Sequence, residues 1–325
     1  MTGREPDREK QFREIIRLEG LAEQYRREQR KKRREAVRSS AAPAESQKVS
    51  KARRIWRRAK KYAGKKVRAA FRREAGTELD TGNARSRRKL YFRDEKIVVY
   101  TALFGAYDRL WEPMFHPENI DYVLLSDQPV PENSIWQPGE YEQLLPQEIR
   151  EDPIRCNRWC KMHPHLLFPE YTYSIYVDAN IRILSDLTPA AAGLDQYPAA
   201  MFRHKKRDCV YEEVQACIDQ NKADPASLRE HEKMIASYGV PRHWGLLEAS
   251  IIARKHGDPL CVQLMEAWWK AFCAGSGRDQ ISLIGCLWKA GIEPSVIGTL
   301  GSNLQRCDLF LQMPHESSGR RHSAG

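Results

Sequence analysis

The chain has 325 residues, of which 41% are hydrophobic, so it is long enough and apolar enough to build a folded core. Its net charge of +11 is unevenly placed, because residues 1–90 hold 30 of the 54 Lys and Arg but only 12 of the 43 Asp and Glu. The remainder is slightly acidic, so the basic character belongs to the N-terminal segment. This distribution excludes a wholly disordered chain and a folded body that is basic throughout.

The N-terminal 90 residues predict a basic helical arm. Residues 9–38 are charged and favour helix, residues 51–73 are intensely basic, and linker-like sequences occupy 39–50 and 74–90. Within 51–73, apolar residues from Trp56 to Phe71 recur at three- and four-residue intervals, which predicts an apolar stripe surrounded by Lys and Arg. Two interpretations stay open: a helix lying on an anionic membrane surface, or a solvated tail.

The sequence shows neither a membrane span nor a secretory signal. No apolar run reaches the about 18–20 residues that a span requires, and the first ten residues lack an apolar segment. We therefore expect a cytoplasmic protein, held at the inner membrane face if the arm binds there. Eight cysteines are scattered among apolar neighbours, which suits reduced thiols. Cys156, Cys160, His163 and His165 suggest a zinc site, but their spacing is unlike that of paired structural zinc ligands.

From Lys96 onward, short apolar runs alternate with helical patterns. Residues 96–102, 121–126 and 173–178 predict buried strands, and residues 155–168, 258–273 and 279–290 predict helices. Strands that alternate with helices predict an α/β domain with a mainly parallel sheet flanked by helices. In such sheets ligands bind beyond the carboxyl ends of the strands, so the residues that follow each strand are functional candidates.

Polar residues follow two of the predicted strands. Asp178 and Asn180 end the third strand, where two oxygen-bearing side chains one residue apart can face one cation, and oxygen ligands suit Mg²⁺ or Mn²⁺. An ordinary turn is the alternative, because Asp and Asn are common turn formers. The first strand leads into Gly105, Tyr107 and Asp108, which can face a ligand or form a simple turn.

The sequence resembles the TOD/MUCI glycosyltransferase-like family in four separated motifs. These are TALFGAYDRL (101–110), RCNRWCKMHPHLLFPEYTYSIYVDANIRI (155–183), FRHKKRDCVYEEV (202–214) and GRDQISLIGCLWK (277–289). The resemblance implies a GT-A-like, Rossmann-like nucleotide-sugar-binding fold with a mixed, mainly parallel sheet. We place this domain at residues 92–315, between the arm (1–90) and a tail (316–325).

The resemblance also implies a metal site and a basic helix face. Asp178, Asn180 and His315 would hold Mn²⁺ or Mg²⁺, with Asn180 standing where the family's D-x-D element has a second Asp. Arg155, Arg158 and Lys161 are spaced three residues apart, and a basic group upstream of D-x-D is typical of donor contact. A solvated basic face is the alternative. The full set of donor-binding candidates is Thr101, Ala102, Phe104, Tyr107, Asp108, Arg155, Arg158, Lys161, Trp244 and Arg320.

Three residues are the catalytic candidates. Asp279 and Gln280 open the last predicted helix, where a helix cap is the alternative, and the resemblance places such a pair beside the donor sugar. The resemblance places Glu248 in a segment, 243–256, that stands for a strand lining the sugar pocket. No separate general base is evident, and the resemblance implies a retaining reaction in which the departing phosphate accepts the proton.

We therefore expect a metal-dependent glycosyltransferase. It would transfer a sugar from a nucleoside-diphosphate donor to a glycan or lipid-linked acceptor in cell-surface or capsular polysaccharide synthesis. The alternative is a non-catalytic module that binds a nucleotide sugar, a membrane or nucleic acid. Trp56, Tyr62 and Phe71 interleave with Lys and Arg, but the arm has no recognised nucleic-acid motif, so we expect no nucleic-acid partner.

Overall fold

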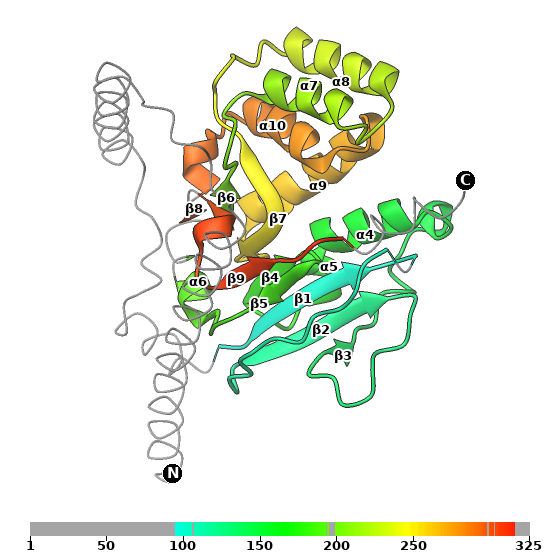
Figure 1. The fold of residues 1–325 in the computed structure, drawn as a ribbon, viewed down its shortest axis with the longest axis vertical. Helices are drawn as coiled ribbons and strands as arrows, with labels where there is room; N and C mark the ends of the chain where they lie inside the picture. The colour runs from blue at the N-terminus through cyan, green and yellow to red at the C-terminus, as the bar shows by residue number, and fades with distance from the viewer. Residues whose placement is uncertain are drawn as a thin grey trace, which may run out of the picture.

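The computed structural model describes residues 95–315, apart from residues 106, 193, 195–198, 298 and 302 and the side chains of residues 192, 296, 299 and 306. The predicted arm (1–90) and tail (316–325) lie outside the described residues. Within that part, a seven-stranded sheet has the strand order β3-β2-β1-β4-β7-β6-β8, and helices flank it (Figure 1). The expected α/β architecture with a mixed, mainly parallel sheet is confirmed.

The central strands are short apolar runs that are buried along most of their length. The strands of the sheet are β1 (Ile97–Leu103), β2 (Ile120–Ser126), β3 (Gln137–Pro138), β4 (Tyr173–Val177), β6 (Ala199–Arg203), β7 (Leu247–Arg254) and β8 (Thr299–Gly301). A separate antiparallel ribbon pairs β5 (Ile181–Ile183) with β9 (Phe310–Gln312). The three strands predicted from the sequence are confirmed within a residue or two.

The direction of β7 determines which residues gather at one edge of the sheet. β1 pairs in parallel with β2 and β4, and β6 pairs in parallel with β8, whereas β7 is antiparallel to both β4 and β6. The first residues of β7 therefore lie beside the last residues of β4 and β6. We call this edge, where β1, β2, β4 and β6 end and β7 begins, the carboxyl edge.

Helices cover both faces of the sheet (Figure 1). They are α4 (Pro153–Met162), α5 (Pro164–Leu167), α6 (Thr188–Ala192), α7 (Val210–Asp219), α8 (Pro225–Ser237), α9 (Pro259–Ala274) and α10 (Asp279–Lys289). Short 3₁₀ turns are η1 (Gln147–Ile149), η3 (Pro294–Ile297) and η4 (Leu304–Arg306). The predicted helices at 258–273 and 279–290 are confirmed as α9 and α10.

An Asp-Pro pair starts three of these helices. In α4, α8 and α9 the capping Asp accepts backbone N–H groups of the first turn, and the following Pro occupies a position whose N–H would lack a helical partner anyway. The pair Asp224-Pro225 was therefore a readable start signal for α8, which the apolar periodicity did not predict.

The predicted helix at 155–168 is interrupted. α4 ends at Met162, and α5 starts at Pro164 after His163, which has a non-helical backbone (φ −120°, ψ 45°). A proline disfavours the helical conformation in the residue before it and has no N–H to donate. Pro164 therefore divides the segment into two helices.

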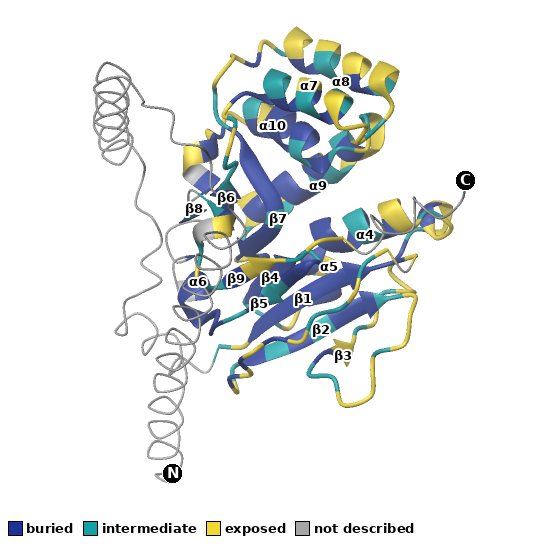
Figure 2. Cartoon of the chain, viewed as in Figure 1, coloured by how far each residue is buried: buried dark blue, intermediate teal, exposed yellow. Residues whose placement is uncertain are grey.

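Two apolar cores lie on opposite faces of the sheet. Along β1, Val98 and Tyr100 pack into the core shared with α4, α9 and α10, whereas Ile97 and Val99 pack into the core shared with α6 and the β5–β9 ribbon. This alternation follows from the two-residue period of a strand, and both faces are covered, so β1 reads as one continuous apolar run. Figure 2 shows β1 and β7 largely buried, whereas β3 and the outer surface of α8 are exposed.

Buried polar groups attach α4 to the sheet. Arg254 of β7 is fully buried; its Nη1 donates to the backbone carbonyl of Lys161 at 2.7 Å, and its Nη2 donates to the Tyr100 hydroxyl. The Tyr100 hydroxyl in turn donates to the Lys161 carbonyl at 3.1 Å, and burial raises the pKa of Tyr100 so that it keeps this proton. These bonds fix the end of α4, where Lys161 points toward the carboxyl edge.

Candidate active site

Lys161 lies at the centre of a buried charge network at the carboxyl edge. Its side chain is 1% exposed, and its Nζ lies 2.7 Å from Asp279 Oδ2 and 3.7 Å from Asp178 Oδ1. The ammonium also lies 5.0 Å from the centre of the Tyr176 ring, which favours a cation. Because a buried charge is costly unless it is paired, these contacts hold Lys161 in one position between two carboxylates.

Asp279, the first residue of α10, is the most strongly engaged carboxylate of the network. Its Oδ2 also lies 3.1 Å from Arg158 Nε, and its Oδ1 accepts the backbone N–H of Gln280 at 3.0 Å. Burial alone would raise the pKa of Asp279, but Lys161, Arg158 and Arg278 together hold that pKa far below its ordinary range. Asp279 is therefore a carboxylate whose two oxygens are both used within the protein.

Asp178 is the most exposed member of the network, with a side chain 32% exposed. It follows β4 directly; its backbone N–H donates to the Ser250 carbonyl at 2.8 Å, and its Oδ1 accepts the Tyr176 hydroxyl at 2.9 Å. Two cations and two carboxylates thus meet where strand β4 ends, and Asp178 faces outward. A strand-end carboxylate held in this way can bind an approaching cation.

The predicted metal ligands Asn180 and His315 lie together. The Asn180 backbone carbonyl accepts the Met313 N–H at 2.8 Å, and its side-chain Nδ2 donates to the Met313 carbonyl at 3.1 Å and lies 3.4 Å from His315 Nε2. His315 Nδ1 lies 2.8 Å from Asp108 Oδ2, across 207 positions of the sequence. Pairing of the β5–β9 ribbon brings these distant residues to the turn that follows Asp178.

Three side chains of this region could hold a divalent cation: they are the carboxylate of Asp178, the amide oxygen of Asn180 and the imidazole of His315. A carboxylate on the other ring nitrogen of a histidine, as Asp108 is here, is the usual support of a metal-binding imidazole. Oxygen and imidazole ligands together suit Mn²⁺ and are compatible with Mg²⁺.

Glu248 and Gln280 lie near the starts of β7 and α10, respectively. Glu248 is buried in the second position of β7; Ser250 Oγ donates to its Oε1 at 3.3 Å, and its Oε2 has no hydrogen-bond partner among the described residues. Burial raises the pKa of Glu248, and the nearby Lys205 only partly offsets this effect. Gln280 Nε2 donates to the Leu247 carbonyl at 3.0 Å, which fastens the start of α10 to the start of β7.

The candidate donor contacts from β1 and the loop after it lie either in the interior or beside His315. Thr101, Ala102 and Phe104 are buried, and Phe104 packs edge-on against Tyr141. Their side chains therefore belong to the interior of the fold. Asp108 contacts His315 as described above, and Tyr107 is 55% exposed, with its ring centre 5.5 Å from that of His315.

Three further candidates lie away from the network or outside the described residues. Trp244 packs edge-on against Trp288, with ring centres 5.2 Å apart. Arg155 is exposed, and its Nε lies 3.6 Å from Oδ2 of Asp152, the cap of α4. Of the three basic residues predicted to share one helix face, only Arg158 and Lys161 therefore take part in the network. Arg320 lies outside the described residues.

Two residues at the carboxyl edge were not singled out from the sequence. Asp127 follows β2, and its Oδ2 accepts the Gly105 N–H at 2.8 Å, so it shapes the loop after β1. Asn157 of α4 donates to the Ala102 carbonyl and accepts from Arg158 through its side-chain oxygen. Asp127 directly follows a predicted strand, so the rule that selected Asp178 would also have selected it.

The zinc interpretation of residues 156–165 is not supported. Cys156 Sγ donates to the Ile149 carbonyl at 3.1 Å within the core, whereas His163 and His165 face Glu266 at 3.5 Å and 3.1 Å. Burial lowers the pKa values of both histidines. These side chains pack and pair within the fold and do not share one centre.

An α/β sheet with a charge network at its carboxyl edge is an arrangement in which ligands bind beyond the strand ends. The family described as TOD1/MUCI70, glycosyltransferase-like domain, matches residues 144–315. This match covers more than half of the chain, which therefore belongs to that family. No curated protein matches the chain. Among the described residues, no helix has the length and apolar character needed to cross a bilayer.

The central ion pair yields a stability prediction. Lys161→Met should lower the free energy of unfolding by about 3–5 kcal/mol, because it leaves a buried carboxylate without its closest cation. The matched control is Lys233→Met on α8, where Lys233 Nζ lies 2.8 Å from Glu230 Oε1 but is 73% exposed, so the change should be about 0–1 kcal/mol. Urea denaturation of both variants measures the difference.

The pH dependence of this effect separates an electrostatic loss from a packing loss. The folded-state pKa of Asp279 is depressed, so its stabilisation is fully present above the unfolded value of about 3.9 and is lost as the pH falls toward the folded value. The gap between the wild type and Lys161→Met should therefore narrow below pH of about 4. A gap that is constant with pH would contradict the ion-pair account.

Removing the charge of Glu248 should stabilise the protein, whereas removing the charge of Lys161 should destabilise it. Its folded-state pKa is raised, so stability is lost as the pH rises from about 4.3 through the folded value, and Glu248→Gln should stabilise the protein at neutral pH by about 0.5–2 kcal/mol. Glu213→Gln is the control, because this buried carboxylate accepts from Arg207 Nε at 2.6 Å and its loss should destabilise. Calorimetric melting of both variants at pH 7.5 measures these changes. Destabilisation by Glu248→Gln would contradict the raised folded-state pKa of Glu248.

Proposed function

We propose that the protein transfers a glycosyl group from a nucleoside-diphosphate sugar, with the donor diphosphate bound at the carboxyl edge beside Asp178. The observation that supports this proposal is the placement of Arg158 and Lys161 between two carboxylates where β4 ends. Negative charge grows on the departing diphosphate in the transition state, so fixed cations at that point accelerate the step. Membership of a glycosyltransferase-like family supports the same reaction class.

The residues of the network have distinct proposed roles. Arg158 is the basic group whose side chain solvent partly reaches, at 23% exposed, so it is the proposed contact of the diphosphate. Lys161 is buried, and its proposed role is to hold Asp178 in position through the contact of its Nζ with Asp178 Oδ1. Asp279 positions Arg158 and Lys161, because its two oxygens are used by these cations and by the Gln280 N–H. Tyr107, Gln280 and Glu248 are the proposed contacts of the donor and its sugar.

A divalent cation, Mn²⁺ or Mg²⁺, is part of this proposal. Asp178, Asn180 and His315 would hold it, and it would supply neutralisation of the donor diphosphate. Asn180 contributes a neutral ligand in place of a second carboxylate, so the site has less negative charge than a D-x-D site.

We further propose that the reaction is retaining and that the acceptor is a glycan or lipid-linked sugar in cell-surface or capsular polysaccharide synthesis. Glu248 is the only one of the proposed sugar contacts that carries a carboxylate, and we assign it to the sugar, with the departing phosphate accepting the proton of the acceptor. The basic segment 51–73, which lies outside the described residues, would hold the enzyme at an anionic membrane where such acceptors occur.

A non-catalytic nucleotide-sugar-binding protein is the second candidate. The observation that favours it is the engagement of Asp279, since neither oxygen of this carboxylate remains for the sugar. The two candidates are separated by measuring the rate at which nucleoside diphosphate is released from the donor in the presence of Mn²⁺. Turnover of the donor supports the enzyme, and tight binding without turnover supports the second candidate.

The donor site is tested by thermal shift with a panel of nucleotide sugars. The selected donor should raise the melting temperature in the presence of Mn²⁺, because a ligand that binds only the folded state stabilises it by mass action. Asp178→Asn should weaken donor binding about tenfold or more, which corresponds to about 1.4 kcal/mol. Asp219→Asn, on the exposed end of α7, is the matched control and should bind like the wild type.

The comparison of Asp178→Asn with Asp219→Asn has one outcome that would contradict the proposed donor site. If Asp178→Asn binds the selected donor as tightly as Asp219→Asn with Mn²⁺ present, the proposed donor site at the end of β4 is wrong. Equal binding by the wild type with and without a chelator would reject the divalent cation while leaving the protein contacts in place.

A further inference from the structure

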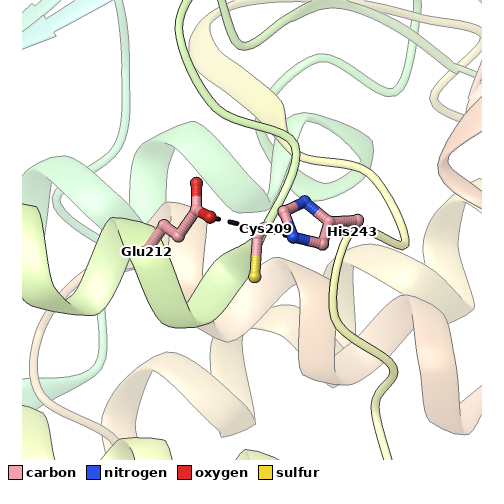
Figure 3. Close-up of side chains that lie close together, drawn as sticks. All are labelled: Cys209, Glu212 and His243. Atoms are coloured by element: carbon pink, nitrogen blue, oxygen red, sulfur yellow. Dashed lines mark ion pairs between the residues drawn. The ribbon is translucent and has the colours of Figure 1, made fainter.

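A second group of metal-ligating side chains lies outside the network described above. Within the described part of residues 95–315, Cys209, Glu212 and His243 form the group of three whose ligand atoms all lie within 4.8 Å of one another. Cys209 and Glu212 come from the start of α7, and His243 comes from the loop that precedes β7. Figure 3 shows the three side chains converging, with the ion pair of Glu212 and His243 drawn.

The histidine of this group is oriented for metal binding. His243 Nδ1 lies 2.7 Å from Asp208 Oδ1, and its Nε2 lies 3.8 Å from Glu212 Oε1. A carboxylate that accepts from one ring nitrogen leaves the other as the lone-pair donor, which is the common support of a zinc-bound histidine. His243 has a positive φ of 58°, a backbone conformation that is uncommon for residues other than Gly.

The cysteine of this group lies at the start of α7. Cys209 is the cap residue of α7, is buried, forms no side-chain capping hydrogen bond and belongs to no disulfide among the described residues. Glu212 in the first turn adds a carboxylate, and the side chains of both Glu212 and His243 are exposed, so an ion reaches the group from solvent.

We infer that Cys209, Glu212 and His243 form a zinc site, with Asp208 orienting the histidine. Sulfur, nitrogen and oxygen ligands together select Zn²⁺ over Mg²⁺, which prefers oxygen alone. Zn–S bonds of about 2.3 Å and Zn–N bonds of about 2.0 Å bring ligand atoms closer together than 4.8 Å, so the three side chains would close around the ion. A water molecule from the exposed side would complete the four ligands.

The site would fasten two loops at the rim of the candidate active site. The loop after β6 contains Asp208 and Cys209, and the loop before β7 contains His243; a backbone bond from the Gly245 N–H to the Asp208 carbonyl (2.9 Å) already joins them. β7 then continues to Glu248 within three residues of Gly245. Zinc would thus hold the segment that leads into Glu248, and this role is independent of the proposed transfer reaction.

The test is zinc retention by the untagged full-length protein. After treatment with a chelator and addition of Zn²⁺ alone, the wild type should keep about one equivalent through gel filtration, measured by mass spectrometry of the metal. Cys209→Ser and His243→Ala should each reduce retained zinc about tenfold or more. Asp208→Asn should weaken affinity about 10–100-fold. Cys273→Ser removes an exposed cysteine elsewhere and should retain zinc like the wild type.

Cobalt substitution provides a readout that misfolding does not imitate. Co²⁺ bound to the wild type should show a thiolate-to-metal charge-transfer band that Cys209→Ser lacks, while circular dichroism of that variant stays native. Failure of the wild type to retain zinc would overturn the inference. Equal retention by the wild type, Cys209→Ser and His243→Ala would overturn it too, because the metal would then be held elsewhere.

Discussion

The contact of Lys161 with Asp279 is the interaction on which the arrangement of the carboxyl edge depends. It joins the end of α4 to the start of α10, across 118 positions of the sequence, inside a core from which water is excluded. Neither charge can be buried alone, so the two helices must dock together before either group is satisfied. Arg158 and Asp178 complete the charge balance, and the partly exposed Asp178 is the point where this interior network reaches solvent.

The reversed strand β7 is the second constraint. Because it runs against β4 and β6, its first residues share an edge with the last residues of both. Glu248 therefore lies near Asp178, and the loop carrying His243 lies near the loop that follows β6. An all-parallel sheet would have placed the start of this strand at the opposite edge. The edge accordingly combines an oxygen-rich group around Asp178 with a sulfur-containing group around Cys209.

The sequence was most informative where local pattern determines structure. The apolar runs of β1 and β4 and the periodicity of α9 and α10 predicted those elements, and the polar residues after β4 drew attention to Asp178 and Asn180. The contacts of those residues could not be predicted, because they arise from pairing over long separations, as with Asp108 and His315. The cluster of Cys209 with His243 was missed for the same reason, since the two residues lie on separate loops that meet only in the folded sheet. Thr101 and Ala102 were selected by motif alone, and both lie in the interior because both faces of the sheet are covered at β1.

The central claim is that this network is the binding site of a nucleoside-diphosphate group. A crystal structure of the protein with Mn²⁺ and the nucleoside diphosphate selected by the ligand screen tests this claim most directly. The account predicts the diphosphate within hydrogen-bonding distance of Arg158, with the ion bound by Asp178 and by at least one of Asn180 and His315. A diphosphate bound away from the end of β4, with Arg158 and Asp178 unchanged and solvent-facing, would contradict it.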